Sequence, residues 1–271
     1  SSITNNFYVD DFLKSESTSE KCIDTVCEVA QVIASCGFNL TSFNSNSKNV
    51  LESVSCGDKP SKTSLSINNN DVTALGVIWD TKSDLLQFKV NIIDEVTITK
   101  RNILKILAST FDPLGLINPC IILARKIFQE CCSMKLPWDQ LVPPEISLAW
   151  KKWVDSIRKL NNYSVPRSFK SQDVESVELH MFCDGSEKAY GVAAYAKFLH
   201  SDNTVSSVLI SSKSRLTPIN NSTLKTIPRI ELCAAKLGVD LARKLISELE
   251  YNFTKEVFLD RQYHCFEIHS Q

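Results

Sequence analysis

Between residues 178 and 260 the spacing of apolar residues changes from a strand-like period to a helical one and back again. Residues 178–183, 191–198 and 205–212 are short β-rich runs, residues 229–249 form a long amphipathic repeat, and residues 255–260 are a further β-rich run. Three strands, a helix and another strand are typical of an α/β unit with a mixed sheet. The sequence therefore predicts an α/β (α+β) fold, with a mixed-sheet domain in its last third.

Three carboxylates stand at the junctions of these elements. Asp184 follows the first strand, Glu231 lies near the start of the helix, and Asp260 ends the last strand. Glu231 shares a helical face with the small residues Ala234 and Gly238, so it should point at the sheet, where a carboxylate is costly unless it meets a cation. All three could converge at one edge of the sheet and bind two Mg²⁺ ions. Each residue taken singly also has a purely structural explanation. Asp184 could belong to a turn, Glu231 could be an acidic residue favoured in the first turn of a helix, and Asp260 could simply end a strand.

A second carboxylate pair lies near the start of the chain, in the apolar run Phe7-Tyr8-Val9-Asp10-Asp11-Phe12. Charged residues are depleted in strands, so a hairpin tip is expected here. Such a tip would project Asp10 and Asp11 to one place, where a divalent metal can hold them for phosphoryl transfer. A solvated Asp-Asp turn is the alternative.

The remaining elements are predicted from periodicity and turn residues. A helix is expected after residues 15–19, with its end at Gly37, and a hairpin is expected around the turn at residues 80–84. Further helices are expected from Thr99 to the Asp112-Pro113 break, over residues 121–132 and over residues 145–160. Residues 163–172 contain Pro166 and show little periodicity, so they are predicted to be a linker.

Charge is distributed unevenly along the chain. Residues 1–96 carry 7 Lys and Arg against 13 Asp and Glu, residues 97–172 carry 12 against 5, and residues 173–271 carry 11 against 13. A basic middle would suit contact with a polyanion, and acidic flanks would suit metal-dependent chemistry on it. A solvated basic helical surface is the alternative.

The ten cysteines are scattered without a Cys-x-x-Cys pair, which indicates free thiols in a reducing compartment rather than a disulfide framework. His264, Cys265 and His269 resemble a zinc cluster but have no second pair of ligands, so zinc is not expected. The longest apolar stretch is interrupted by Asn118-Pro119, so no transmembrane helix is expected. Because the chain does not begin with Met, we expect a fragment of a longer polypeptide.

Several motifs resemble those of BEL/Pao-type LTR retrotransposon polyproteins. Tyr8-Val9-Asp10-Asp11 is similar to the palm motif of reverse transcriptases. Six further segments resemble the region that follows the palm in these polyproteins: Thr99-Lys100-Arg101, Phe111-Asp112-Pro113-Leu114-Gly115-Leu116, Trp138-Asp139, Val165-Pro166-Arg167, Lys213-Ser214-Arg215 and Thr226-Ile227-Pro228-Arg229-Ile230-Glu231-Leu232. The resemblance covers nearly the whole chain, a region that is also labelled Pao retrotransposon peptidase.

The resemblance implies three domains. Residues 1–96 would be the C-terminal part of a reverse transcriptase palm, residues 97–172 a helical thumb or connection, and residues 177–271 a ribonuclease H-like domain truncated at its C-terminus. It further implies metal-binding and catalytic roles for five residues, with Mg²⁺ or Mn²⁺ as the cofactor. These residues are Asp10 and Asp11 in the palm and Asp184, Glu231 and Asp260 in the ribonuclease H-like domain.

The function implied is two-metal phosphodiester chemistry on RNA–DNA hybrids by a reverse transcriptase/ribonuclease H segment. The implied partners are RNA, DNA and the rest of the polyprotein, without a membrane, in a cytoplasmic virus-like particle or the nucleus. Polymerase activity is not expected from this chain alone, because the first polymerase aspartate is missing from it. One alternative is a non-catalytic nucleic-acid-binding remnant or domesticated element. An aspartic peptidase is the other, although Asp184-Gly185-Ser186 has the wrong order for its Asp-Thr/Ser-Gly loops.

Overall fold

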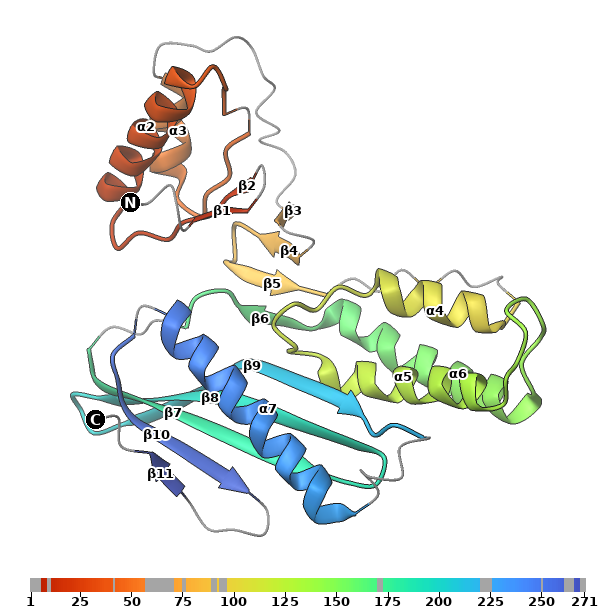
Figure 1. Ribbon diagram of the computed structural model, residues 1–271. Helices are drawn as coiled ribbons and strands as arrows, with labels where there is room; N and C mark the ends of the chain where they lie inside the picture. Colours follow the sequence, from red (N-terminus) through yellow and green to blue (C-terminus); the bar gives the residue numbers. More distant parts are fainter. Residues whose placement is uncertain are drawn as a thin grey trace. The chain divides into compact units, whose positions relative to one another are not determined.

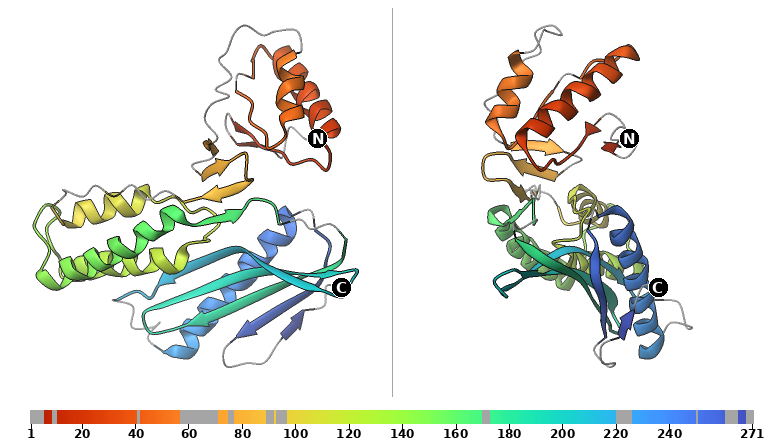
Figure 2. Two further views of the ribbon diagram at one scale, coloured as in Figure 1. Left: turned by 180° about the vertical axis from the view of Figure 1, so that it is seen from behind. Right: turned by 90° about the vertical axis from the view of Figure 1, so that its left-hand side faces the viewer.

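The computed structural model describes residues 6–8, 11–40, 42–56, 71–74, 77–88, 92, 97–169, 173–219, 226–249, 251–260 and 266–268. The chain divides into two compact units, whose elements are drawn in Figures 1 and 2. Unit 1 comprises Ser1–Phe88 and Asn162–Ser168, and unit 2 comprises Lys89–Asn161 and Phe169–Gln271. Across the described residues, no helix has the length and apolar character needed to cross a membrane.

Unit 1 begins with a short hairpin. Strands β1 (Phe7–Tyr8) and β2 (Asp11–Phe12) pair antiparallel, with Phe7 opposite Phe12. The centroids of these two rings lie 5.0 Å apart, so the apolar residues on either side of the turn close the hairpin. The hairpin predicted here is thus confirmed, but Asp11 lies in strand β2 rather than at the tip, and Asp10 lies outside the described residues.

Two helices follow the hairpin, α2 (Ser19–Ser35) and α3 (Lys48–Cys56). The hydroxyl of Thr18 accepts a hydrogen bond from the backbone N–H of Lys21 at 3.3 Å and so caps the start of α2. The chain leaves α2 through Gly37, which has a φ of +82°. The helix predicted to end at Gly37 is confirmed, whereas α3 was not predicted.

A four-stranded antiparallel sheet completes unit 1. Its strands, in spatial order, are β3 (Asp71–Ala74), β4 (Val77–Asp80), β5 (Leu85–Gln87) and β6 (Ser164–Pro166). Strands β4 and β5 confirm the predicted hairpin. The linker prediction was wrong for β6, which pairs with β5. Three residues are too few to show a period, and proline is tolerated there because β6 is an edge strand.

Arg167 fastens the returning segment to unit 1. Its guanidinium donates hydrogen bonds of 2.6 and 3.0 Å to the Asp84 carboxylate, and its backbone N–H donates to the Asp84 carbonyl at 3.0 Å. The side chains of Trp79 and Asn46 also donate to the Asp84 carboxylate. Burial on its own raises the pKa of Asp84, but the bonds from Arg167, Trp79 and Asn46 outweigh it and hold that pKa below its ordinary value.

Unit 2 is built on a five-stranded mixed sheet. Its strands, in spatial order, are β11 (Phe266–Ile268), β10 (Phe253–Asp260), β7 (Val174–Gly185), β8 (Ala189–His200) and β9 (Val205–Leu216). Strands β7, β8 and β9 are antiparallel, and helix α7 (Ile227–Glu248) leads into β10, which runs parallel to β7. The predicted order of three strands, a helix and a fourth strand in a mixed sheet is confirmed.

Helix α7 lies across one face of this sheet (Figure 1). Along β7 every second residue facing the helix is buried, from Val177 through Met181 to Cys183. The helix approaches the sheet closely at Gly238, where an added Cβ would lie 2.4 Å from the Sγ atom of Cys183. Glycine at this position therefore sets the distance between helix and sheet.

Three helices precede the sheet in unit 2, namely α4 (Lys100–Ser109), α5 (Asn118–Ser133) and α6 (Pro144–Ile157), and they confirm the predicted helices. Helix α6 packs on α5, with Trp153 Nε1 donating to the Cys120 carbonyl at 2.8 Å. Helix α5 in turn packs on β9. The helices predicted as thumb or connection thus share one compact unit with the sheet. The limits 1–96, 97–172 and 177–271 remain predictions about functional domains, since one compact unit can hold more than one domain.

Candidate active site

Asp184 lies near the end of β7, directly after Cys183. The alternation of the strand places Cys183 beneath α7 and Asp184 on the opposite side, where its side chain is exposed. Oδ1 of Asp184 accepts a hydrogen bond from the N–H of Gly185 at 2.8 Å. Ser186 then closes the turn into β8, with its N–H donating to the Ala189 carbonyl at 2.8 Å. This tight turn holds Asp184 at the end of the sheet.

Glu231 lies in the first turns of α7 and is only 8% exposed. The end of β7 packs directly against it. A Cβ added to Gly185 would lie 2.9 Å from Cγ2 of Ile230 and 3.1 Å from the backbone nitrogen of Glu231. Ala234 and Gly238 are buried further along the same helix. Glu231 therefore faces the sheet among small residues, as its helical position predicts.

A buried carboxylate needs a partner that offsets its lost hydration. Among the described residues, the hydrogen bonds and ion pairs do not include one to the Glu231 side chain. In the described part of the chain, every side-chain nitrogen or oxygen that is fully shielded from solvent has a hydrogen-bond partner. Since the Glu231 oxygens have no such partner among these residues, solvent still reaches them. A carboxylate fixed by packing and reachable from solvent is suited to accept a cation.

Asp260 ends β10, the strand parallel to β7. The register places Asp260 opposite Cys183, one residue from Asp184, and neighbouring strands lie about 4.8 Å apart. The fold thus brings the backbone of Asp260 and Asp184 together, and it brings Glu231 to the same end through Gly185. The side chain of Asp260 lies outside the described residues.

Carboxylate oxygens are the ligands preferred by Mg²⁺ and Mn²⁺, so this donor set fits such ions. Among the described side chains, which exclude that of Asp260, no group of three or more His, Cys, Asp or Glu is placed to hold a metal. The convergence of the three backbone positions agrees with the prediction, and metal binding by Asp184, Glu231 and Asp260 remains a prediction.

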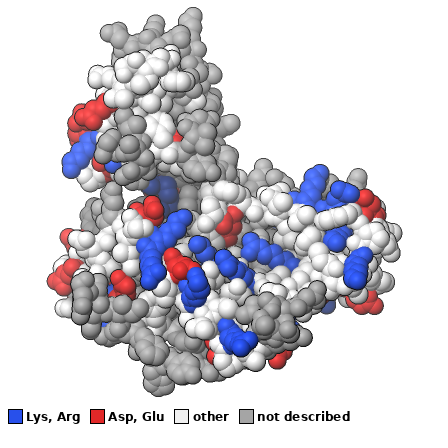
Figure 3. All heavy atoms as spheres, viewed as in Figure 1, with Lys and Arg blue, Asp and Glu red and all other residues white. Residues whose placement is uncertain are grey.

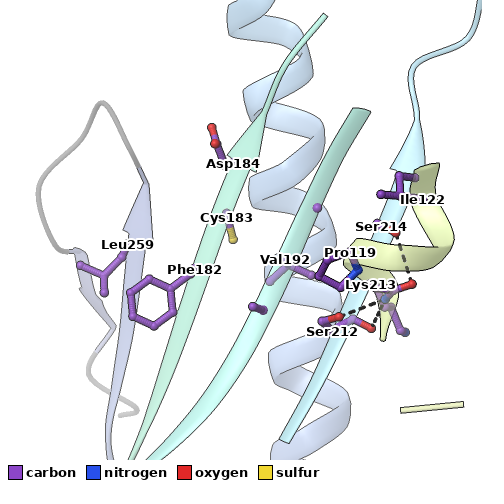
Figure 4. A pocket seen from close by; sticks show the side chains of 13 residues that line it. Pro119, Ile122, Phe182, Cys183, Asp184, Val192, Ser212, Lys213, Ser214 and Leu259 are labelled. Atoms are coloured by element: carbon purple, nitrogen blue, oxygen red, sulfur yellow. Dashed lines mark hydrogen bonds between the residues drawn. The ribbon is translucent and has the colours of Figure 1, made fainter. Parts of the chain in front are cut away.

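A hollow of about 430 Å³ opens beside Asp184. Figure 4 shows it in front of the sheet, with α7 behind. Its lining comes from four strands and the start of α5: Asn118, Pro119, Ile122, Phe182, Cys183, Asp184, Gly191, Val192, Ala193, Ser212, Lys213, Ser214 and Leu259. Phe182 is 44% exposed and forms part of its apolar lining. The hollow gives Asp184 an open approach from solvent.

The other predicted carboxylates, Asp10 and Asp11, belong to unit 1. Asp11 is exposed in β2, opposite Tyr8 of β1. Asp10 lies outside the described residues. The structure therefore holds Asp11 and the Asp184–Glu231 pair in different units, and the palm role of Asp10 and Asp11 remains a prediction.

The eight cysteines whose side chains the structure describes are free thiols. Burial raises the pKa of the Cys131 and Cys120 thiols, which keeps them protonated and weakly nucleophilic. The group His264, Cys265 and His269, considered above for zinc, lies outside the described residues.

An unpredicted junction joins the segment before α5 to the outer edge of β9. The backbone N–H of Ser212 and the hydroxyl of Ser211 both donate to the Leu114 carbonyl, at 2.8 and 2.7 Å. The hydroxyl of Ser212 donates to the Gly115 carbonyl. Gly115 has a φ of +76°, and a Cβ added there would lie 1.9 Å from the Ser212 carbonyl oxygen. The Leu114-Gly115 pair therefore covers an edge that would otherwise be open to another strand.

Asp112 and Asn118 hold this junction from either side. The Asp112 carboxylate accepts hydrogen bonds from the N–H groups of Leu116 and Ile117, both at 2.9 Å. Burial raises the pKa of Asp112, and these bonds oppose the rise. Nδ2 of Asn118 donates to the Ser212 carbonyl at 2.9 Å. The Asp112-Pro113-Leu114-Gly115 motif thus has a structural role in this junction. Its glycine was the one sequence signal that the backbones of this segment and β9 approach closely.

Two further motifs contact each other. Arg101 donates two hydrogen bonds to the Asp139 carboxylate, at 2.7 and 3.0 Å. Nζ of Lys100 lies 4.6 Å from the ring centroid of Trp138. Part of the positive charge of the middle segment is therefore occupied within the protein.

Comparisons with known proteins add a family and two weak structural similarities. Residues 99–261 match the family described as the Pao retrotransposon-like RNaseH-like domain. Among proteins with curated descriptions, none matches the chain.

Both structural similarities are to a foamy viral protease-reverse transcriptase. The form named dRH, in complex with double-stranded DNA, has 18% identity over 65% of this chain and 29% of that chain, with a TM-score of 0.36. The other structure, also with double-stranded DNA, has 17% identity over 71% of this chain and 36% of that chain, with a TM-score of 0.21. The chain spans about a third of the length of these proteins, and similarities this weak carry no argument.

Proposed function

Since residues 99–261 make up more than half of its length, the chain belongs to the Pao retrotransposon-like RNaseH-like domain family, and on this premise we propose that it hydrolyses the RNA strand of RNA–DNA hybrids. The observation that carries this proposal is Glu231. This residue is only 8% exposed at the start of α7, and the helix meets β7 there at Gly185, next to Asp184. A protein keeps a buried carboxylate in such a position at a cost, and a bound cation offsets that cost.

Asp184, Glu231 and Asp260 would hold Mg²⁺ or Mn²⁺ in this proposal. When bound, two such ions supply an activated water and stabilise the charge on the leaving oxygen. Packing of Gly185 against the backbone of Glu231 fixes the position of that residue before substrate arrives, and the exposed Asp184 faces the incoming phosphodiester. The water oxygen bonds to phosphorus as the P–O3′ bond breaks, which leaves a 5′-phosphate and a 3′-hydroxyl.

The proposal extends to partners and place. The substrate is an RNA–DNA hybrid, and RNA, DNA and the rest of a retroelement polyprotein are the associated partners. Such a protein would act in a cytoplasmic virus-like particle or the nucleus. Asp10 and Asp11 are proposed as two metal-binding aspartates of a polymerase palm, whose activity this chain is not expected to show alone.

An aspartic peptidase is disfavoured by the packing around Asp184. That chemistry needs two Asp-Thr/Ser-Gly loops sharing one proton, and the sequence contains neither tripeptide. In this chain glycine follows Asp184 directly, because Gly185 must fit against Ile230 of α7. A nucleic-acid-binding protein without cleavage activity is the remaining alternative, and the same experiment separates it.

The test is cleavage of a labelled RNA–DNA hybrid in Mg²⁺ and in Mn²⁺ by the purified chain and by Glu231→Gln and Asp184→Asn. We expect RNA-strand cleavage by the unaltered chain and a loss of at least about 100-fold in both variants. Glu248→Gln is the matched control, since it makes the same change at an exposed position of α7. It should cleave normally.

Thermal unfolding gives a second readout. Mg²⁺ should raise the melting temperature of the unaltered chain, because a ligand that binds the folded state stabilises it. It should not raise that of Glu231→Gln. Cleavage that survives Glu231→Gln would refute the proposal, and hybrid binding without cleavage would favour the non-catalytic alternative.

A further inference from the structure

Four exposed basic side chains of unit 2 come from three elements, α5, β9 and α7. They are Arg125 of α5, Arg215 of β9, and Lys236 and Arg243 of α7, here named the basic strip. Figure 3, viewed from the α7 side, shows Lys and Arg side chains gathered over this part of the surface, with acidic groups sparse among them.

Asp240 connects the members of the strip on α7 and β9. Nζ of Lys236 donates a hydrogen bond of 2.6 Å to the Asp240 carboxylate. This bond first, and then the nearby charges of Arg243 and Arg215, hold the pKa of Asp240 below its ordinary value. The two guanidinium groups therefore lie near Asp240 without pairing with it. With Asp240 near the cations of α7 and β9, and Asp112 near Arg125, two carboxylates among four cations leave an excess of positive charge.

Arg215 lies at the end of the sheet that carries the carboxylates, and from there the strip runs along α7 to Arg243, twelve residues or about 18 Å from Glu231. Ser214 is opposite Gly191, which is opposite Asp184, so these residues form one row across three strands. Arg215 occupies the next row. Arg125 donates a hydrogen bond of 3.5 Å to the Ser214 carbonyl and so extends the strip along α5.

The helices α4 to α6 offer a rival basic surface, but part of its charge is occupied. Arg101 is paired with Asp139 at 2.7 Å, and Lys126 with Glu130 at 3.8 Å. In the strip, the ion pairs among the described residues do not include Arg215 or Arg243. Exposed guanidinium groups without a carboxylate partner are free to contact phosphates, which they bind bidentately.

We propose that the basic strip binds the phosphate backbone of a nucleic-acid strand and leads it to the Asp184–Glu231 end of the sheet. The inference rests on the proposed function, and it places the contact on α7 and β9 rather than on the basic middle segment. Lys236 and Arg243 are two helical turns apart on one face of α7, so both can follow one strand. Phosphate contacts of this kind position a duplex without reading its sequence.

The experiment compares two triple variants that each remove three positive charges. Arg215→Gln/Lys236→Gln/Arg243→Gln alters the strip, and Lys105→Gln/Lys151→Gln/Lys152→Gln alters exposed lysines of α4 and α6. Binding of a labelled RNA–DNA hybrid is measured without divalent cations over a series of salt concentrations. The strip variant should lose about 10-fold or more in affinity, and the slope of log affinity against log salt should fall by about 2–3. The other variant should stay within about twofold of the unaltered chain.

Asp240→Asn supplies a test in which hybrid binding is expected to become tighter rather than weaker. Removing this carboxylate from among the cations of α7 and β9 should tighten hybrid binding by about twofold or more. Thermal unfolding first shows whether the strip variant is folded. The inference is overturned if the folded strip variant keeps the affinity and salt slope of the unaltered chain. It is also overturned if Asp240→Asn leaves hybrid binding unchanged. If the unaltered chain cleaves the hybrid and the strip variant binds it normally, the proposed role of the strip is refuted and the proposed function is not. If binding depends on the strip but the unaltered chain does not cleave, the proposed function is refuted and the role of the strip is not.

Discussion

The two faces of the sheet in unit 2 share the same strands but differ in their environment. On the face beneath α7, residues such as Leu179 and Met181 are fully buried and the helix meets them with small residues. On the opposite face, the alternate residues of β7 are His180, Phe182 and Asp184, and they retain solvent contact. Successive side chains of β7 therefore alternate between the buried core and the solvent-exposed face that carries Asp184. Substitutions at neighbouring positions of this strand should have unlike effects on stability.

The opposite face is organised by polar and aromatic contacts. Glu178 accepts a hydrogen bond from Lys197 of β8 at 3.0 Å and lies 2.7 Å from Nε2 of His180. Phe182 meets Tyr195 edge to face, with centroids 5.6 Å apart. These contacts stay close to solvent, where each contributes little to stability.

The largest contrast is expected between Met181→Ala and Phe182→Ala. Met181 is fully buried, so its truncation should lower the free energy of unfolding by about 2–5 kcal/mol. Phe182 is 44% exposed, and its truncation should cost about 1 kcal/mol. Urea unfolding measures both. Equal losses would show that the two faces do not differ in this way.

A somewhat smaller loss is expected at the edge of β9. Gly115→Ala would place a Cβ against the Ser212 carbonyl, a backbone atom that cannot move aside, and should cost about 2–4 kcal/mol. Gly37→Ala is the control, because its φ is also positive but no atom lies within 4 Å of the added Cβ. It should cost about 1 kcal/mol in the same unfolding measurement. A loss no greater at Gly115 would contradict the close junction.

Helix-to-sheet spacing gives a third test. Gly238→Ala should cost about 1–3 kcal/mol, because the new Cβ meets the sulfur of Cys183. Cys183→Ala removes that sulfur, so the double variant should recover most of the loss in a double-mutant cycle. Strictly additive losses would mean that the two positions do not touch.

The smallest effect concerns Glu178 and depends on pH. The hydrogen bond with His180 first, and then that from Lys197, lower the pKa of Glu178. Its contribution is therefore present above the ordinary value of about 4.3 and lost as pH falls through the lowered value. Glu178→Gln should cost about 0.5 kcal/mol at pH 7 and nothing once the pH lies well below the lowered pKa of Glu178. Glu175→Gln, an exposed position of the same strand, is the control. A cost that persists at low pH would contradict the assignment.

The sequence was informative wherever a period ran for several turns or residues. The long strands and α7 could be predicted because one face of each is apolar, and Glu231 could be placed toward the sheet because it precedes Ala234 and Gly238 at helical spacing. The shared edge of Asp184 and Asp260 was predicted from their positions at the ends of two strands, and the parallel pairing of β7 and β10 agrees with it.

The features that were missed depend on contacts between distant segments. Strand β6 is too short to show a period, and its pairing with β5 is a long-range event. The bonds of Ser211 and Ser212 to Leu114 use main-chain atoms, whose partners leave no pattern in side-chain chemistry. Arg167 carried a charge whose partner, Asp84, could not be identified without the fold.

Strand β6 also determines the order in which unit 1 can fold as the chain leaves the ribosome. Strand β5 is complete before Phe88, but its partner is not made until Pro166. At ordinary elongation rates this interval lasts roughly 4–16 s. During that time one edge of β5 lacks its neighbour, and the helices of unit 2 emerge first. A chain trimmed to residues 99–261 would keep β6 and lose β5 altogether, so the exposed edge would pass to β6.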